Sequence, residues 1–136
     1  MKGLSRYAPL LLRLSLAAVY IWFGISQLTS PDIWMSMVPD WATGMSGMSA
    51  ATIIMLNGWF EIVAGVLLAL GVFVRLLGFV LGVHLLLIAR ELGINAVGVR
   101  DFGLAGATLA IALFGADDFS LSKYIKDRRK NTSLNA

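Results

Sequence analysis

The chain of 136 residues contains no cysteine and only one histidine, His84. The absence of cysteine excludes disulfides, thiol–disulfide relays and thiolate metal sites within the chain. With one histidine, a single copy cannot build a bis-histidine haem site, although haem with a methionine ligand or in a symmetric dimer stays open. The sequence also has no P-loop, dinucleotide-binding, HExxH or serine-hydrolase motif. We therefore expect no metal site in the chain itself.

Charged residues are scarce as well. They make up 14% of the chain, hydrophobic residues make up 58%, and the mean hydropathy is +0.80, whereas soluble domains average about 25% charged and about 45–50% apolar residues. A spanning helix needs about 20 mostly apolar residues, and four such windows are visible, at about 8–28, 50–70, 76–92 and 100–115. The sequence predicts an all-α integral membrane protein, with a four-transmembrane-helix bundle in residues 1–116 and a basic cytoplasmic tail in residues 117–136.

The first window begins with basic residues, as a signal peptide does. Its apolar run exceeds the roughly 7–15 residues of a signal-peptide core, and no A-x-A cleavage site follows. We expect a retained anchor. Residues 29–49, which join it to the second window, are expected to form a polar-to-amphipathic loop. Trp34, Trp41 and the methionines of this loop predict either an interfacial aromatic belt or a cover over an outer cavity.

The basic residues are distributed unevenly between the two sides of the predicted membrane. An even number of spans puts both termini on one side, and nine of the eleven Lys and Arg residues flank that side: Lys2, Arg6, Arg13, Arg75, Lys123, Lys126, Arg128, Arg129 and Lys130. Only Arg90 and Arg100 flank the other. The positive-inside rule then predicts cytoplasmic termini in a plasma membrane, bacterial inner or archaeal. This topology explains the basic residues without a nucleic-acid partner.

Glu61 lies near the centre of the second window, where burying a charge in the bilayer costs roughly several kcal/mol even on the lowest insertion scales. Counting about 1.5 Å per residue, Arg13 in the first helix comes within the combined reach of the two side chains, so we expect an Arg13–Glu61 pair. Asn57 and Gly65 lie one turn before and after Glu61 on the same helix face. Two interpretations remain open: a structural ion pair, or a proton-active carboxylate beside a small ligand cavity.

Two further side chains are candidates for contact with a ligand. His84, in the third window, is expected either to pack and hydrogen-bond within the bundle or to lie beside a quinone or a proton path. Trp59, like the other tryptophans, falls toward the outer half of its helix. Arg90 with Glu91, and Arg100 with Asp101, are expected to be solvated or interfacial ion pairs.

Small residues recur at helical spacing in the last two windows. Gly78 and Gly82 form a GxxxG step, and two small-xxx-small steps follow it, Gly103 with Ala107 and Gly106 with Ala110. Small residues allow close approach of helix backbones in a membrane. We expect them to pack the bundle.

Four stretches carry a family resemblance: Arg13, GISQL (24–28), GWFEIVAGVLLALGVFVR (58–75) and VRDFGLAGATLAIALFGADDFSLSKY (99–124). Together they resemble the DoxX family of small four-helix membrane proteins, and the second-helix stretch is the most specific of them. The resemblance implies the four-helix fold and draws attention to Arg13, Glu61 and Arg75, with the motif glycines Gly24, Gly65 and Gly71. Two positions depart from the family pattern, Gln27 in place of a lysine and Ser122 in place of an aspartate.

Three functions remain open at this stage, and whether the protein is an enzyme is open with them. The resemblance implies a membrane subunit of a redox system that binds a quinone or similar amphiphile. Glu61 would then exchange a proton, Arg13 would tune it, and His84 or Asn57 would hydrogen-bond a ligand carbonyl. The alternative is a non-catalytic accessory subunit of a larger membrane complex. A small-solute transporter is less favoured, because it would require oligomerisation. The expected partners are the lipid bilayer and other membrane subunits or further copies of the chain.

Overall fold

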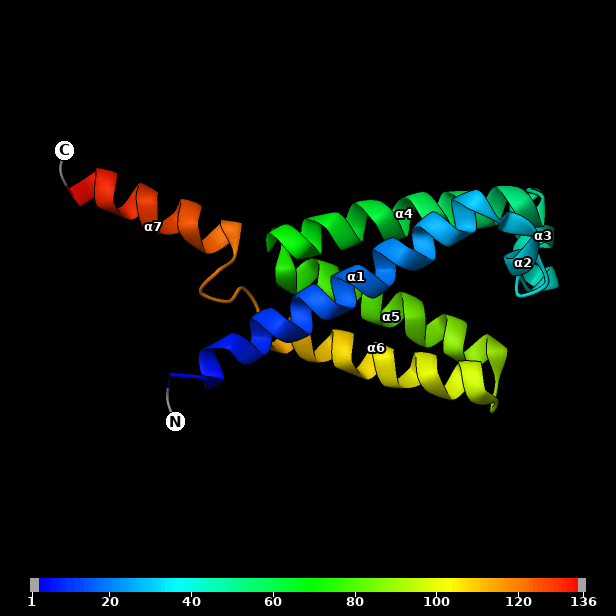
Figure 1. The fold of residues 1–136 in the computed structure, drawn as a ribbon. Helices are drawn as coiled ribbons and strands as arrows, with labels where there is room; N and C mark the ends of the chain where they lie inside the picture. Colours follow the sequence, from blue (N-terminus) through cyan, green and yellow to red (C-terminus); the bar gives the residue numbers. More distant parts are fainter. Residues whose placement is uncertain (1–2, 135–136) are drawn as a thin grey trace.

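The computed structural model describes residues 3–134, and those residues form helices and irregular segments with no strand. Four long helices, α1 (Ala8–Thr29), α4 (Ala50–Leu70), α5 (Val74–Leu92) and α6 (Ala96–Phe114), lie side by side (Figure 1). The short helices α2 (Pro31–Met35) and α3 (Asp40–Ser46) cover one end. A 3-10 turn (Ser5–Tyr7) precedes α1, and α7 (Leu121–Leu134) extends beyond the other end.

Three segments are long and apolar enough to cross a membrane: Ser5–Thr29, Ala50–Leu70 and Ala96–Phe114. Helix α5 is similar in length, with 19 residues, but carries Arg75 near its start and Arg90 with Glu91 near its end. Its central part is apolar between these charges. An all-helical membrane protein is therefore the architecture.

Local signals determine where the long helices begin and end. The side chain of Ser49 accepts a hydrogen bond from the backbone N–H of Thr52 at the start of α4, and Asn95 accepts from Val97 and Gly98 at the start of α6. Such N-caps satisfy backbone donors that have no partner within the helix. The Asn95 cap starts α6 four residues before the predicted boundary near residue 100. Helix α4 ends at Gly71, whose φ of 72° suits glycine best.

The long helices pack as two pairs, α1 with α4 and α5 with α6 (Figure 1). Glycines allow the first pair to approach closely, because a Cβ added at Gly24 would lie 2.6 Å from the backbone oxygen of Gly58. In the second pair, a Cβ at Gly78 would lie 2.9 Å from the backbone nitrogen of Ala112. Leu68 and Leu81 are fully buried where the pairs meet.

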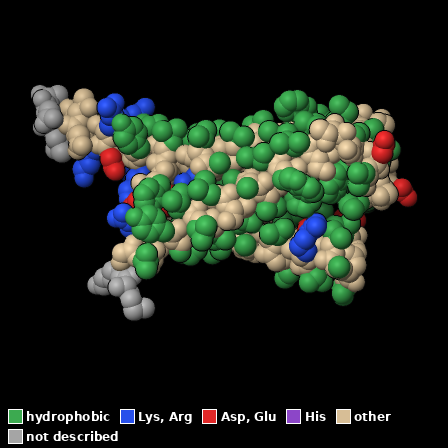
Figure 2. All heavy atoms as spheres, viewed as in Figure 1, with side chains coloured by type: hydrophobic (Ala, Val, Ile, Leu, Met, Phe, Trp, Pro, Cys, Tyr) green, Lys and Arg blue, Asp and Glu red, His purple; other side chains and the backbone are tan. Residues whose placement is uncertain are grey.

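The outer surface of the four long helices is apolar. Figure 2 shows hydrophobic side chains along the body of the molecule, with basic side chains gathered mainly at the end that carries the termini. Trp22, Trp59 and Leu113 are 62%, 58% and 83% exposed. Such a surface suits lipid rather than water. The segments predicted as a loop and a tail contain helices, α2 and α3 in the first and α7 in the second.

Candidate functional site

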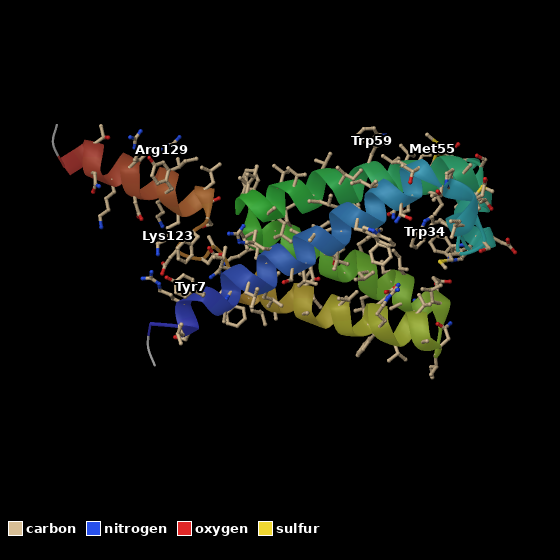
Figure 3. All side chains as sticks on the ribbon, viewed as in Figure 1. Tyr7, Trp34, Met55, Trp59, Lys123 and Arg129 are labelled. Carbon is tan, nitrogen blue, oxygen red and sulfur yellow. The ribbon has the colours of Figure 1, made fainter. Side chains whose placement is uncertain are left out.

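A cavity of about 690 Å³ lies between the two helix pairs, beneath α2 and α3. Small-molecule sites usually measure about 300–1,000 Å³ and are mostly apolar. Most of the wall here is aliphatic and aromatic, and Phe23, Trp34 and Trp41 contribute rings to it. Figure 3 shows Trp34 directed from α2 back toward the long helices. Of the two interpretations left open for residues 29–49, the structure shows the cover over a cavity.

One wall of the cavity carries a polar cluster from α1 and α4. The Glu61 carboxylate is 3% exposed, and its Oε2 accepts a 2.9 Å hydrogen bond from the Gln27 side-chain amide. Asn57 donates to Glu61 Oε1 at 3.2 Å and to Gln27 Oε1 at 2.8 Å. The three side chains form a closed ring of hydrogen bonds. The ring fixes the carboxylate orientation, because each partner is itself held by a second contact.

His84 reaches the same cluster from α5. Its Nε2 lies 3.7 Å from Glu61 Oε1, which is too long for a hydrogen bond. That nitrogen is buried and has no hydrogen-bond partner among the described residues. The imidazole packs edge-on against Phe60, with ring centroids 5.1 Å apart. The structure therefore brings Glu61, Asn57 and His84 together, as the sequence suggested, and adds Gln27.

A second carboxylate, Asp101 of α6, lines the cavity and is 5% exposed. Arg100 donates to its Oδ1 at 2.8 Å, and the guanidinium of Arg100 lies 5.1 Å from the centre of the Phe23 ring. At the rim, the Trp41 indole N–H donates to Glu91 at 3.4 Å. The sequence predicted a solvated or interfacial Arg100–Asp101 ion pair; the pair is present, with Arg100 exposed and Asp101 buried. The pattern of α6 alone does not show which of its faces is buried.

The predicted Arg13–Glu61 pair is also wrong. Arg13 is 2% exposed, and its Nε donates to Asp117 Oδ2 at 2.7 Å while its Nη2 donates to Oδ1 at 3.3 Å. Its Nη1 donates to the backbone oxygens of Leu68, at 2.8 Å, and Ala69. Arg13 thus lies at the level of the last turn of α4, about 10 Å along the helix from Glu61. Counting residues along the helices gives the depth of Arg13 only approximately, which allowed a pair with Glu61. The sequence spacing does not indicate Asp117 as a partner, because it lies 104 residues away along the chain.

The remaining candidates lie outside the cavity wall. Trp59 is 58% exposed and points away from the bundle (Figure 3). Gly24 and Gly65 lie at the contact of α1 with α4, where an added Cβ at Gly65 would lie 2.9 Å from Ile21. Gly71 packs against Ser120, and exposed Arg75 lies against Gly115. These positions shape the bundle rather than contact a ligand.

The chemistry available at the site is hydrogen bonding and proton exchange. Glu61 and His84 are groups that gain and lose protons, and the wall around them is apolar. Among the described residues, no group of three or more His, Cys, Asp or Glu is placed to hold a metal ion. The site is thus suited to a small amphiphilic ligand with a polar end at Glu61.

Comparison with known proteins places the chain in a family. No curated protein and no solved structure matches the sequence. A family model, DoxX, matches residues 8–92, which is more than half of the chain and includes α1, α4, α5 and the polar cluster of Gln27, Asn57, Glu61 and His84. The chain belongs to the DoxX family.

Proposed function

We propose that this protein binds a quinone or similar amphiphile in the cavity between its helix pairs, as the membrane subunit of a redox system. The observation that carries the proposal is the combination of an apolar cavity of about 690 Å³ with a buried, hydrogen-bonded Glu61 on its wall. Ionisable residues within membrane-spanning helices are costly, and they commonly mark substrate or proton paths.

Each polar residue of the cluster has a separate part in this proposal. Gln27 and Asn57 hold the carboxylate of Glu61 in place, and Glu61 exchanges a proton with the polar end of the ligand. His84, 3.7 Å away, is close enough to pass a proton to or from Glu61 after a small shift of its ring. A redox partner protein supplies or removes the electrons. The apolar walls hold the ring and tail of the ligand.

The proposal includes a topology. Helix α5 is the fourth span, because it lies between α4 and α6 and pairs with α6 along its length. Both termini lie at the end that gathers basic side chains, so that end faces the cytoplasm and the helices cross a plasma membrane, bacterial inner or archaeal. The cavity and its cover then open toward the outer side.

The test is saturable binding of a short-tailed quinone to the full chain, purified in a gentle detergent and followed by quenching of intrinsic tryptophan fluorescence, to which Trp34 and Trp41 of the cavity wall contribute. We expect Asn57→Leu to weaken binding about tenfold, because it removes the direct amide contact to Glu61 and the contact that holds Gln27. Trp59→Phe, at an exposed site away from the cavity, serves as the matched control. Non-saturable partition of the quinone, equal in all three proteins, would contradict the proposal. Mass spectrometry of molecules that co-purify from native membranes identifies the natural ligand.

A second candidate is an accessory subunit that docks against another membrane protein. The observation in its favour is the outer face of α6. The prediction that Gly103 and Gly106 pack the bundle was wrong, because both are exposed and nothing lies within 4 Å of an added Cβ. Small residues on an open face permit close helix contact. Under this candidate, the wild-type protein co-purifies with a fixed partner and does not bind quinone. Gly106→Leu would abolish the co-purification.

A further inference from the structure

The polar cluster has used most of its hydrogen-bond donors. The side-chain nitrogen of Asn57 has two hydrogens, and its contacts to Gln27 and Glu61 use both. The Gln27 amide spends one hydrogen on Glu61. Each carboxylate oxygen of Glu61 accepts one of these bonds and has a further lone pair. The unused hydrogen-bonding capacity of the cluster therefore consists mainly of acceptor lone pairs on the Glu61 carboxylate.

Glu61 and His84 do not satisfy each other's hydrogen-bonding capacity. Glu61 Oε1 and His84 Nε2 face each other at 3.7 Å with no hydrogen bond between them, and Nε2 has no other partner among the described residues. A buried polar atom without a partner is unfavourable by about 1–3 kcal/mol. A hydrogen donated from a third group satisfies one or both of these atoms.

In the described part of the chain, the group within ion-pair distance of Glu61 is His84, at 3.7 Å, which is a cation only when protonated. Among the described residues, Glu61 has no Lys or Arg within ion-pair distance. Arg13 is held by Asp117, and Arg100 is held by Asp101. The carboxylate therefore attracts a positive or hydrogen-bearing group, and it repels a second acceptor.

From this balance we propose that the cavity selects ligands whose polar end donates a hydrogen bond to Glu61, a hydroxyl or an ammonium on an aromatic or apolar body. It discriminates against acceptor-only and anionic ligands of the same shape. The inference rests on the proposed function insofar as the cavity must bind a ligand at all. It then names the polarity of that ligand, which neither the cavity size nor the family indicates.

The physical basis is the strength of charge-assisted hydrogen bonds. A hydroxyl or ammonium that donates to a carboxylate forms a bond roughly twice as strong as a neutral one, whereas a carbonyl or ether oxygen at the same place faces another acceptor. An ammonium gains further from the rings of Phe23, Trp34 and Trp41 on the cavity wall. An anionic head group faces Glu61 and Asp101, both buried.

The experiment compares ligands that share one ring and one alkyl tail. They are a hydroquinone, its quinone, its dimethyl ether, an aryl-methylammonium and an aryl-carboxylate, bound anaerobically to the full wild-type chain in detergent. We expect the hydroquinone or the ammonium to bind at least about tenfold more tightly than the quinone, the ether and the carboxylate. The stronger of the two donors tells whether the natural occupant is a hydroxyl compound or an amine.

Two results would overturn the inference without touching the proposed function. They are quinone binding as tight as that of the hydroquinone, and ether binding as tight as that of the parent diol. If none of the five ligands binds saturably, the proposed function fails instead. Glu61→Gln supplies a donor and removes the charge, so it should reduce the donor preference to less than about threefold. Trp59→Phe should preserve the preference, and the wild-type ligand series decides the question even if Glu61→Gln does not fold.

Discussion

Arg13 connects three parts of the chain at the end of the bundle that carries the termini. Its guanidinium binds the Asp117 carboxylate that follows α6 and the carbonyl oxygens of Leu68 and Ala69 at the end of α4. The arrangement satisfies the charge and some of the carbonyls that have no partner within α4. Breaking a buried pair by removing one partner leaves a buried charge uncompensated, which is strongly destabilising.

Arg13→Gln and Asp117→Asn should each lower the free energy of unfolding by about 3–5 kcal/mol. The double variant should lose much less than the sum, giving a coupling energy of at least about 1 kcal/mol. The measurement is reversible unfolding in mixed detergent micelles. The control cycle of Arg13→Gln with Glu61→Gln should be additive within about 0.5 kcal/mol. Strong coupling in the control cycle would instead support an Arg13–Glu61 pair.

The contact between α1 and α4 depends on single hydrogen atoms at glycine. Gly24→Ala should lower the free energy of unfolding by about 1–3 kcal/mol, because the new methyl group meets the rigid backbone oxygen of Gly58 at 2.6 Å. Thermal unfolding in detergent measures the change. Gly103→Ala is the matched control, since nothing lies within 4 Å of its added Cβ, and it should be neutral or slightly stabilising. Equal losses in the two variants would argue against close packing at Gly24.

The short helices α2 and α3 pack over the cavity and form its cover. Trp34 donates to Ser26 at 3.2 Å and packs edge-on against Phe23, with ring centroids 5.4 Å apart. Trp41 donates to Glu91 on α5. The cover is thus attached to both helix pairs, through α1 on one side and α5 on the other.

Trp34→Ala should open this cover and admit water to the cavity. Because the chain has no cysteine, a single Ile53→Cys on the cavity wall reports access without background. Its rate of labelling by a water-soluble maleimide should rise several-fold in the Trp34→Ala protein. Trp59→Ala, which removes an outward-facing ring, should leave the rate unchanged. An unaltered rate in both proteins would show that the cover does not restrict access.

At the scale of the whole molecule, the two ends of the bundle differ. At the end that carries the termini, Arg13, Asp117 and Ser120 are all buried. At the other end the cavity separates the two helix pairs, and only the short helices α2 and α3 lie over it. The cavity thus lies at one end of the bundle and the buried Arg13–Asp117 pair at the other.

The proposed topology predicts opposite labelling of two single cysteines in intact cells. Asn131→Cys, near the end of α7, should react with a membrane-impermeant maleimide only after the cells are opened. Asp32→Cys, on α2, should react in intact cells. Both positions are exposed, so differences in burial do not account for the result. Reaction of both cysteines from the same side would exclude four spans.

Composition and hydropathy by themselves determined the membrane helices, because burial in lipid requires long apolar runs with satisfied backbone groups. The sequence also located Glu61, Asn57 and His84, since a polar residue within an apolar run is conspicuous. Tertiary structure alone decided their partners. Gln27 is the partner of Glu61, and Asp117, 104 residues away along the chain, is the partner of Arg13. Helix periodicity gives the depth and the face of a residue within one helix, but it does not indicate which helix packs beside that face.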